Sequence, residues 1–395
     1  MRPLEGIIVV ELSLIISGAT CGKVLQEYGA EVIKIESPNG DNYRYFGSVY
    51  GTPTDDDENI IFETINSGKK FVKMDLRTDE DLLRLRRLLR HADVFVTNYR
   101  PSLLKELGLS YEQIKDEYPR LVYASITGYG EAGPDVGRPG LDTVTFWASS
   151  GFIRDMTVDE SGNYPVYVPI GAGDNIVGTE LAGAIAMALF QRERTGKGTN
   201  VCTSLYGTAL WTFSSISSPT QYGYKWPRGR YEGSPGGTPY LTSDGYWVLT
   251  TLGKYNELWP GLCRAFRAYD LIGNPRFNNL EAAVKPENRK DAIKALEHHA
   301  ALLTAQEICS VLDEEGIVYT VLGHLLDNHS SMQAMANAYT VPYTYPSGKK
   351  VTIVKPPIHF SGCVTLPHTP SRHIGADTEE VYREFSIESD DARHK

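Results

Sequence analysis

Short runs of β-branched residues alternate with helical patterns in the first third of the chain. This alternation is typical of βαβ units and predicts an α/β fold with a mainly parallel sheet. Between the first two runs, Gly18–Tyr28 predicts a helix, and Thr78 with Asp81 forms a capping-box pattern that begins another. The runs expected to form strands are Ile7–Val10, Glu31–Ile35, Phe71–Met74, Val94–Thr97 and Leu121–Ile126.

The later part of the chain has a different pattern. Ile176–Gln191 is apolar and rich in Gly and Ala, which predicts a buried helix that neighbouring backbones approach closely, too short to span a membrane. Tyr222–Tyr240 is rich in Gly and Pro and predicts a linker or long loop. After it, the pattern predicts a smaller α/β domain and a return to strands. The expected strands are Tyr246–Thr251, Lys350–Val354 and Ile358–Phe360, and the expected helices are Glu257–Ala268, Arg289–Leu302, Thr304–Glu314 and Asp377–Phe385.

Length and composition narrow the class of protein. A chain of 395 residues exceeds what one hydrophobic core usually supports, which favours two domains. The formal charge of -10 argues against a nucleic-acid partner. No apolar run is long enough to span a bilayer and the N-terminus lacks a signal-peptide core, so we expect a cytoplasmic protein. The five cysteines form no CxxC pair and the nine histidines no HExxH motif, so we expect no disulfide framework and no metal.

Familiar site motifs fail in detail. A dinucleotide-binding loop needs GxGxxG, whereas Gly18 and Gly22 give only part of that spacing, so NAD binding is not favoured. Lys69 and Lys70 follow Gly68, but the P-loop pattern around them is incomplete. The chain also lacks a GxSxG nucleophile elbow.

A carboxylate is the remaining candidate. Asp174 lies between a Gly-rich turn and the apolar helix, near N-cap or first-turn amides that we expect to favour its ionised form. Asp is also among the residues that commonly cap helices, so the position alone fits a structural role equally well.

An ordered set of motifs resolves this choice by resemblance. The chain resembles the class III CoA transferases, the family of formyl-CoA transferase and carnitine CoA-transferase. The resemblance covers nearly the whole chain, and the motifs are individually weak but specific as a set. They include Pro3–Ile7, Gly29–Glu36, Asn39–Asp41, Asn66–Lys70, Ala92–Pro101, Leu107–Tyr111, Ser125–Gly130, Arg138–Asp142, Gly173–Asp174 and Thr195–Gly198.

The resemblance implies an architecture and a mechanism. We expect a large Rossmann-like domain from residues 1–215 and 326–395, a small domain from 216–325, and an interlocked homodimer. Asp174 corresponds to the family's nucleophile, which forms an aspartyl anhydride and then an aspartyl-CoA thioester. Asp142 matches the acidic residue that supports it, while Gly236 and Gly237 lie in the glycine loop that covers the intermediates.

The resemblance also implies binding residues, with acyl-CoA and small carboxylic acids as the partners and no metal or NAD. Ile16 and Ser17 stand near where oxalate enzymes carry a Gln, so we expect a more apolar site, closest to 2-hydroxyacyl-CoA transferases of anaerobic amino-acid fermentation. Glu106 departs from the Arg of well-known members. The expected CoA contacts are Arg44, Lys69, Lys70, Asn98, Tyr99, Arg100 and Lys105.

Two alternatives stay open at this point. α-Methylacyl-CoA racemases share the family and use a His just before the position of Asp142, but Leu141 stands there and cannot accept a proton. A non-catalytic CoA-binding protein on the same scaffold is the other alternative.

Overall fold

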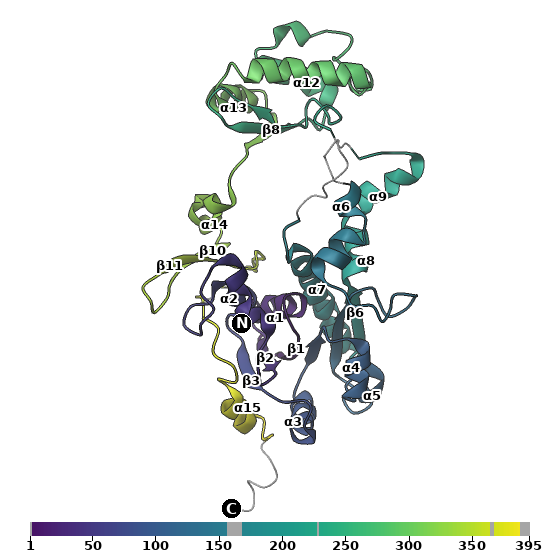
Figure 1. The fold of residues 1–395 in the computed structure, drawn as a ribbon, viewed down its shortest axis with the longest axis vertical. Coiled ribbons are helices and arrows are strands. Elements are labelled where there is room, and N and C mark those ends of the chain that lie inside the picture. Colours follow the sequence, from purple (N-terminus) through teal and green to yellow (C-terminus); the bar gives the residue numbers. More distant parts are fainter. Residues whose placement is uncertain (1, 156–167, 227–228, 364–366, 388–395) are drawn as a thin grey trace, which may run out of the picture. The chain divides into compact units, whose positions relative to one another are not determined.

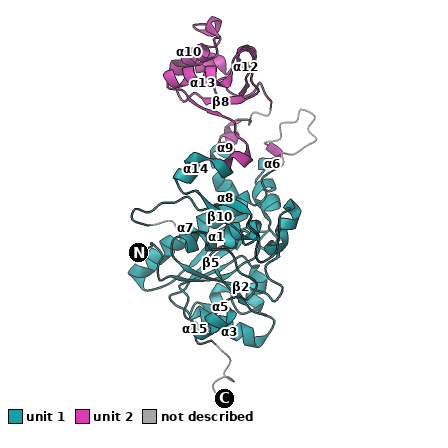
Figure 2. Cartoon of the chain, turned by 90° about the vertical axis from the view of Figure 1, so that its left-hand side faces the viewer, with its two compact units in different colours: residues 1–152, 168–218, 329–395 teal, residues 153–167, 219–328 magenta. Residues whose placement is uncertain are grey.

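The computed structural model describes residues 2–155, 168–226, 229–363 and 367–387. Contacts within the chain divide it into two compact units, coloured separately in Figure 2. The first unit comprises residues 1–152, 168–218 and 329–395, and the second comprises residues 153–167 and 219–328. Both ends of the chain therefore belong to the first unit.

A six-stranded parallel sheet forms the centre of the first unit (Figure 1). Its strand order is β3-β2-β1-β4-β5-β6, the order of the Rossmann fold, which confirms the predicted class. Sequence reasoning missed β6, an edge strand whose side chains are mostly half-buried and which therefore lacks a long apolar run. The strands are β1 Ile8–Leu12, β2 Glu31–Glu36, β3 Lys70–Lys73, β4 Val94–Thr97, β5 Val122–Thr127 and β6 Asn200–Ser204.

Helices cover both faces of this sheet. Successive strand residues such as Val9 and Val10 point to opposite faces, and both are fully buried. On one face, Val10, Ile33 and Phe95 pack with α3 (Asp79–Leu89), α5 (Tyr111–Ile114) and α15 (Thr378–Glu384). On the other lie α1 (Ser17–Glu27) and α7 (Ala172–Thr195), which pack against each other (Figure 1). The C-terminal helix therefore completes the core that the N-terminal strands begin.

The long helix α7 confirms one expectation and corrects another. A Cβ on Gly178 would lie 2.4 Å from the Ser17 carbonyl oxygen, so α1 and α7 approach as closely as predicted. The predicted burial holds on one side of the helix only, because Ile176, Met187 and Phe190 are exposed. An apolar composition predicts that a helix is buried, but it does not show whether residues of the same chain bury all of its faces.

The returning C-terminal segment forms one hairpin instead of the two expected strands. β10 (Thr340–Thr344) pairs antiparallel with β11 (Lys350–Val354), which confirms the strand at 350–354. The strand predicted at Ile358–Phe360 is wrong. There the Ile358 N–H donates to the Tyr28 hydroxyl, and the Phe360 ring packs edge-on against Tyr28, so this one side chain at the C-terminal end of α1 holds the segment.

Shorter helices connect these elements in the first unit and at its boundaries. They are η1 Asn42–Tyr50, α2 Ile60–Asn66, α4 Pro101–Glu106, η2 Asp142–Ala148, α6 Phe152–Asp155, α8 Leu205–Thr212, α9 Ser214–Ser217, η3 Ser218–Tyr222, η5 Leu325–Ser330 and α14 Met332–Ala336.

The second unit is a small α/β body with its own core. Its antiparallel sheet has the order β7-β8-β9. Trp259, Phe266 and Leu296 are fully buried in the core between this sheet and the helices. The Thr304 side chain and Glu307 form a capping box at the start of α13, as a Thr before an apolar run favours. The elements are β7 Tyr240–Leu241, β8 Trp247–Thr251, α10 Tyr255–Ala265, η4 Tyr269–Leu271, α11 Leu280–Ala283, α12 Pro286–Ala300, α13 Ala305–Glu314 and β9 Val318–Val321.

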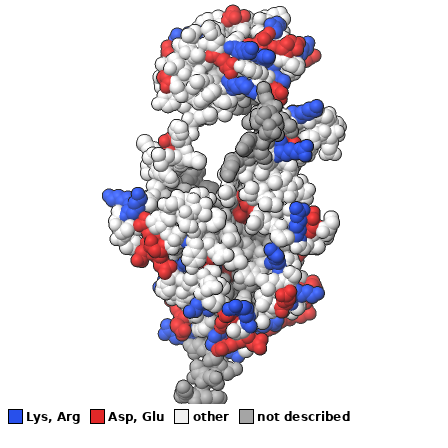
Figure 3. Space-filling view, viewed as in Figure 1, with Lys and Arg blue, Asp and Glu red and all other residues white. Residues whose placement is uncertain are grey.

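Charged side chains of both signs are interspersed on the face seen in Figure 3. Among the described residues, no helix is both long enough and apolar enough to cross a bilayer.

Candidate active site

Several of the predicted site residues of the first unit lie where the strand order reverses. β1 and β4 are neighbours, but the chain leaves them in opposite directions along the sheet, which makes their carboxyl ends the switch point where ligands bind in such folds. Asn98, just after β4, accepts the Leu14 N–H at 2.9 Å and donates to the Leu14 carbonyl at 2.7 Å. The two loops at the switch point are therefore tied together by one amide side chain.

Asp174 and Asp142 meet at the start of α7. Asp174 is the third residue of this helix and is 8% exposed. The Asp142 carboxylate accepts the Gly171 N–H at 2.8 Å and the Asp174 N–H at 3.0 Å. Asp142 therefore caps α7 from the separate helix η2, while the side chain of Asp174 remains free of that task.

The protonation of Asp174 differs from the sequence-based expectation. Burial, together with the negative charge of Asp142, raises the pKa of Asp174 to about 7, and a hydrogen bond from Ser17 only partly opposes this. Burial also raises the pKa of Asp142, against the backbone N–H groups that favour its charged form. The helix start was expected to stabilise the Asp174 carboxylate, but that expectation was wrong because burial and the charge of Asp142 outweigh it, and Asp142 itself accepts the Gly171 and Asp174 N–H groups.

Small residues allow this close arrangement. A Cβ on Gly173 would lie 2.4 Å from Asp142 Oδ1 and 2.5 Å from the Phe146 ring. Gly171 has a left-handed φ of 84°, which glycine adopts without strain, and lies against Ile16. The Gly-rich turn before Asp174 is thus explained by the packing of η2 and α1 against the start of α7.

The two residues predicted to contact substrate also lie here. Ile16 and Ser17 are buried at the start of α1, and the nearby Ser17 hydroxyl lowers the pKa of Asp174 against the larger effect of burial. Ile16 packs with Ala19 and Ile65, and the Tyr43 ring covers this cluster. The surroundings of Asp174 on this side are therefore apolar, as expected from the absence of a Gln at Ile16.

Sequence reasoning missed a buried ionic network beside the segment that connects β1 to α1. Lys34 lies 2.9 Å from Glu11 and 3.0 Å from Asp41, and Lys69 lies 2.8 Å from Glu11. Although burial opposes it, the ammonium groups of Lys34 and Lys69 lower the pKa of Glu11 to about 2. A signal was present in the sequence: Glu11 and Lys34 interrupt apolar runs and face each other in the β1–β2 register.

Three of the expected CoA contacts are paired with acidic side chains of this chain. Lys69 is buried and also donates to the Ala19 carbonyl, and Arg44 is buried in a bidentate pair with Glu36. Lys70 begins β3, at the amino end of the parallel sheet, and pairs there with Glu31 and other acidic groups. The structure does not bring these three cations to the switch point as free phosphate ligands.

The other expected CoA contacts follow β4 and lie at the carboxyl end of the sheet. Arg100 is the N-cap residue of α4 and Lys105 lies in its last turn, and both are exposed. Tyr99 is half-buried against the core, and burial raises its pKa. The Asn98 side-chain amide, by contrast, donates to the Leu14 carbonyl and to the Ser17 hydroxyl.

The glycine loop belongs to the second unit. The Gly236 carbonyl accepts the Leu252 N–H at 3.1 Å, and a Cβ on Gly236 would lie 2.5 Å from the Leu252 side chain. Gly237 is exposed and has more space, since the nearest atom to a Cβ there would be 3.6 Å away. The loop is thus anchored at Gly236 and open at Gly237.

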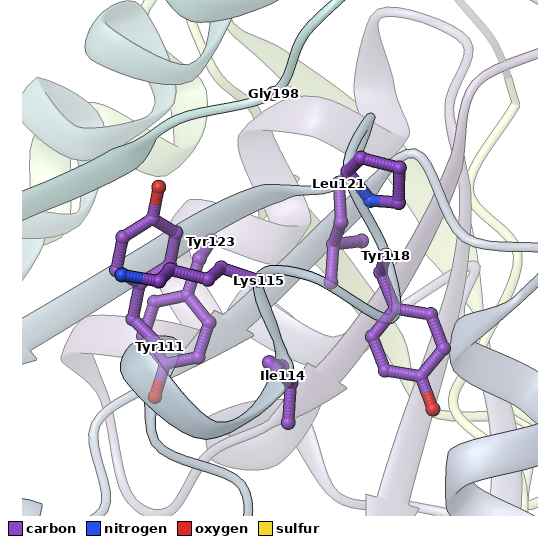
Figure 4. Close-up of a pocket in the computed structure, with 8 residues that line it drawn as sticks. Tyr111, Ile114, Lys115, Tyr118, Leu121, Tyr123 and Gly198 are labelled. Atoms are coloured by element: carbon purple, nitrogen blue, oxygen red, sulfur yellow. The ribbon is translucent and has the colours of Figure 1, made fainter.

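A separate small pocket in the first unit contains none of the predicted site residues (Figure 4). It is lined by Tyr111, Ile114, Lys115, Tyr118, Pro119, Leu121, Tyr123 and Gly198. Among the described residues, no group of three or more His, Cys, Asp or Glu side chains is arranged to hold a metal ion.

Comparison with known proteins gives a consistent result across nearly the whole chain. The family model described as CoA-transferase family III matches residues 4–378. The (R)-2-hydroxy-4-methylpentanoate CoA-transferase of Clostridioides difficile is 34% identical over 98% of this chain and 96% of its own length. The cinnamoyl-CoA:phenyllactate CoA-transferase of Clostridium sporogenes is 33% identical over 96% of this chain and 93% of its own.

A solved structure extends this likeness to the fold. A CAIB/BAIF family protein from Brucella suis superposes with a TM-score of 0.81 at 28% identity, covering 97% of this chain and 99% of that one. The resemblance drawn from the ordered motifs is thereby confirmed, and this chain belongs to CoA-transferase family III.

Proposed function

We propose that this protein transfers CoA from an acyl-CoA to a carboxylic acid through covalent intermediates on Asp174. The observation that carries the proposal is the position of Asp174, buried at the start of α7 with a pKa raised to about 7 and with its side chain not used for capping. A carboxylate stripped of water is a stronger nucleophile than one in solution, and at neutral pH a large fraction of this group is still ionised.

The proposed reaction conserves the energy of the thioester. The Asp174 carboxylate attacks the thioester carbonyl carbon, the C–S bond breaks, and CoA thiolate leaves with the electron pair. The thiolate then attacks the aspartyl carbonyl of the mixed anhydride, which releases the first acid and leaves an aspartyl-CoA thioester. An incoming carboxylate attacks that thioester, which expels CoA thiolate and forms a second mixed anhydride. The thiolate then attacks the acyl carbonyl of the new acid, and the Asp174 carboxylate leaves as the new acyl-CoA forms. Anhydride and thioester are similarly reactive, so each step has a modest barrier.

Asp142 supports this chemistry without joining it. Its two hydrogen bonds with backbone N–H groups fix the first turn of α7, and burial together with its charge makes the Asp174 carboxylate more basic, and therefore a stronger nucleophile once ionised. Arg100 and Lys105 are the expected phosphate contacts whose side chains are exposed, so we assign them to CoA.

For the acid, we propose a 2-hydroxy acid with an aryl or branched side chain. Both relatives compared above are named for such acids. The apolar cluster of Ile16, Ala19 and Ile65 beside Asp174 suits a side chain of this kind.

We also propose a homodimer, as is typical of the family. Met187 and Phe190 on α7 and Trp211 on α8 are 74%, 61% and 75% exposed in the isolated chain, a degree of apolar exposure that favours burial by a second subunit. Light scattering of the purified protein measures the mass directly, and a monomer at micromolar concentration would contradict this assembly.

The decisive experiment traps the covalent intermediate. Purified protein is incubated with acyl-CoA and hydroxylamine, and Asp174 is examined by mass spectrometry for the hydroxamate that an anhydride or thioester yields. Asp174→Ala and Asp174→Asn serve as controls, and both should fold, bind CoA and lose transfer by several orders of magnitude. Full turnover by freshly purified Asp174→Ala would exclude the mechanism.

A further inference from the structure

The segment between β1 and α1, residues 13–16, is held by side chains from other parts of the sheet. Lys34, from β2, donates its Nζ to the Ser13 carbonyl at 3.1 Å. Asn98, after β4, bonds to both the N–H and the carbonyl of Leu14. Asp41, after β2, accepts the Ile15 N–H at 3.0 Å. A loop whose backbone is fixed in this way has little freedom to relax.

Ile15 adopts a backbone conformation that its side chain disfavours. Its φ is 64°, in the left-handed region, where a β-branched residue is a genuine outlier. Such a conformation persists only when surrounding contacts over-determine it, and these outliers cluster at functional sites. Asn98 bonds to both backbone groups of Leu14 and the Asp41 carboxylate accepts the Ile15 N–H, so the peptide bond that leads into Ile15 is held at its carbonyl and at its N–H.

Asp41 is the central member of this constraint. Its Oδ1 accepts the N–H groups of both Ile15 and Tyr43 at 3.0 Å, and its Oδ2 lies 3.0 Å from Lys34. Lys34 continues to Glu11, which also pairs with Lys69, and all of these side chains are buried. Two carboxylates and two ammonium groups balance in charge, so the network is rigid and poor in alternative arrangements.

The strained segment points directly at the nucleophile. After Ile15 the chain places Ile16 against Gly171, and the Ser17 carbonyl against Gly178 of α7. The Ser17 hydroxyl lies close enough to Asp174 to lower the pKa of that carboxyl, and Asn98 Nδ2 donates to the same hydroxyl at 3.3 Å. A change of φ at Ile15 would therefore move Ser17 relative to the Asp174 carboxylate.

We propose that Asp41 and the strained residue Ile15 form a clamp that aims Ser17 at Asp174 and so positions the carboxylate for attack on the thioester. The inference rests on the proposed function of Asp174. Asp41 and Ile15 act as positioning residues, because they hold the loop and do not themselves contact the reacting atoms. The strain is kept because a relaxed loop would leave the Asp174 oxygens free to rotate away from the acyl carbon.

The test relieves the strain and follows the rate. Ile15→Gly removes the conformational penalty and opens φ values that Ile15 cannot adopt, so Ile16 and Ser17 gain freedom beyond the fixed Leu14–Ile15 peptide bond, while the fold should be kept and the thermal midpoint should not fall greatly. We expect kcat to drop between about 10-fold and 100-fold while KM for the acyl-CoA stays within about 2-fold. Ala338→Gly is the matched control, because Ala338 also has a left-handed φ, 53°, but lies outside the site, so its kcat should be unchanged.

The pH profile separates positioning from a general loss of structure. The Ser17 hydrogen bond lowers the pKa of Asp174, so a displaced Ser17 should move the acid limb of kcat to higher pH. The ionisable groups that face Asp174 are Asp142 on η2 and Tyr43 on η1, and both remain in the variant. Loss of folded protein would lower the amplitude at every pH without moving the limb.

Asp41→Asn is a second variant, in which the side chain keeps nearly the same shape. If Ile15→Gly does not fold, the kcat and pH profile of Asp41→Asn test the proposal. Asp41 is absent from the groups that shift Asp174, so a displaced pH limb in this variant also reports geometry. Wild-type kcat and an unmoved limb in the folded variants, with Asp174→Asn inactive, would overturn the clamp alone. Turnover by Asp174→Asn would instead overturn the proposed function.

Discussion

The Asp142 carboxylate accepts the backbone N–H of Asp174 at 3.0 Å, so one acidic residue caps the helix on which the other is carried. Backbone N–H groups at the start of α7 favour the charged form of Asp142, and burial together with the charge of Asp142 raises the pKa of the Asp174 side chain. Two carboxylates at one helix start thus have different tasks because only one of them occupies the N–H groups.

The activity should follow the ionisation of Asp174. Because the proposed nucleophile is the ionised carboxylate and its pKa lies at about 7, kcat should increase with pH through that value and level off above it. In Asp142→Asn the neighbouring charge is lost, so the acid limb should move to lower pH. Rates measured from pH 5 to pH 9 with saturating substrates test both statements.

The same variant should lose stability, since an amide cannot accept both N–H groups as well as a carboxylate does. We expect a loss of about 1 kcal/mol in the free energy of unfolding. If the acid limb of the pH profile of Asp142→Asn coincided with that of the wild type, Asp142 would not control the charge of Asp174.

Replacing the nucleophile should stabilise the protein at alkaline pH. The pKa of Asp174 is about 7 when folded and 3.8 in its ordinary state, so between these values the folded protein binds more protons and its stability falls as pH rises. Asp174→Asn removes this effect, and its advantage should be small at pH 4 and largest above pH 7, at most ~4 kcal/mol. Thermal midpoints at pH 5 and pH 8 measure it.

The exposed Asp116 provides the control for this comparison. Asp116→Asn should show no such growth of its advantage between pH 5 and pH 8. An equal midpoint difference between wild type and Asp174→Asn at both pH values would contradict a raised pKa.

Two glycines on one helix should respond in opposite ways to alanine. At Gly178 a Cβ would lie 2.4 Å from the Ser17 carbonyl, so Gly178→Ala must push α1 and α7 apart and should cost about 1–3 kcal/mol. At Gly183 a Cβ meets no atom within 4 Å, and Gly183→Ala should gain about 1 kcal/mol from helix propensity. Denaturant unfolding of both variants measures the difference. Similar shifts of the same sign would contradict the close approach.

Two lysines predicted to contact CoA should separate into a structural and a binding role. Lys69→Met leaves Glu11 buried with one partner fewer and should cost about 3–5 kcal/mol of stability. Lys105→Met, on the exposed surface of α4, should leave stability nearly unchanged and raise KM for acyl-CoA several-fold. Unfolding curves and KM values of both variants measure these effects. A large loss of stability in Lys105→Met with little loss in Lys69→Met would contradict this division.

The glycine loop should limit hydrolysis. Gly237→Ala fits the space available, since the nearest atom to its Cβ is 3.6 Å away, but it stiffens the backbone of the loop. If the loop excludes water from the anhydride, the ratio of acyl-CoA hydrolysis to CoA transfer should rise at least several-fold. Counting free thiol against transferred CoA measures this ratio. A ratio equal to that of the wild type would remove the lid role.

The sequence by itself determined the layered architecture and the identity of the nucleophile candidate. Strands such as Val94–Thr97 are short apolar runs whose residues are buried on both faces, so their pattern is legible locally. The helix starts were equally local, as the Thr78 cap before α3 illustrates. The family motifs then singled out Asp174, which composition and spacing left equal to any capping aspartate.

Tertiary structure alone decided the electrostatics of the site. The pKa of Asp174 depends on burial and on Asp142, which is 32 positions away in sequence, and no local rule places that pair together. For the same reason the structural role of Lys69 could not be predicted from sequence, because its ion-pair partner Glu11 lies far away in the chain, on β1. Contacts between residues far apart in the sequence decide which charges are paired. The sequence pattern shows only features that depend on neighbouring residues, such as strand periodicity and helix caps.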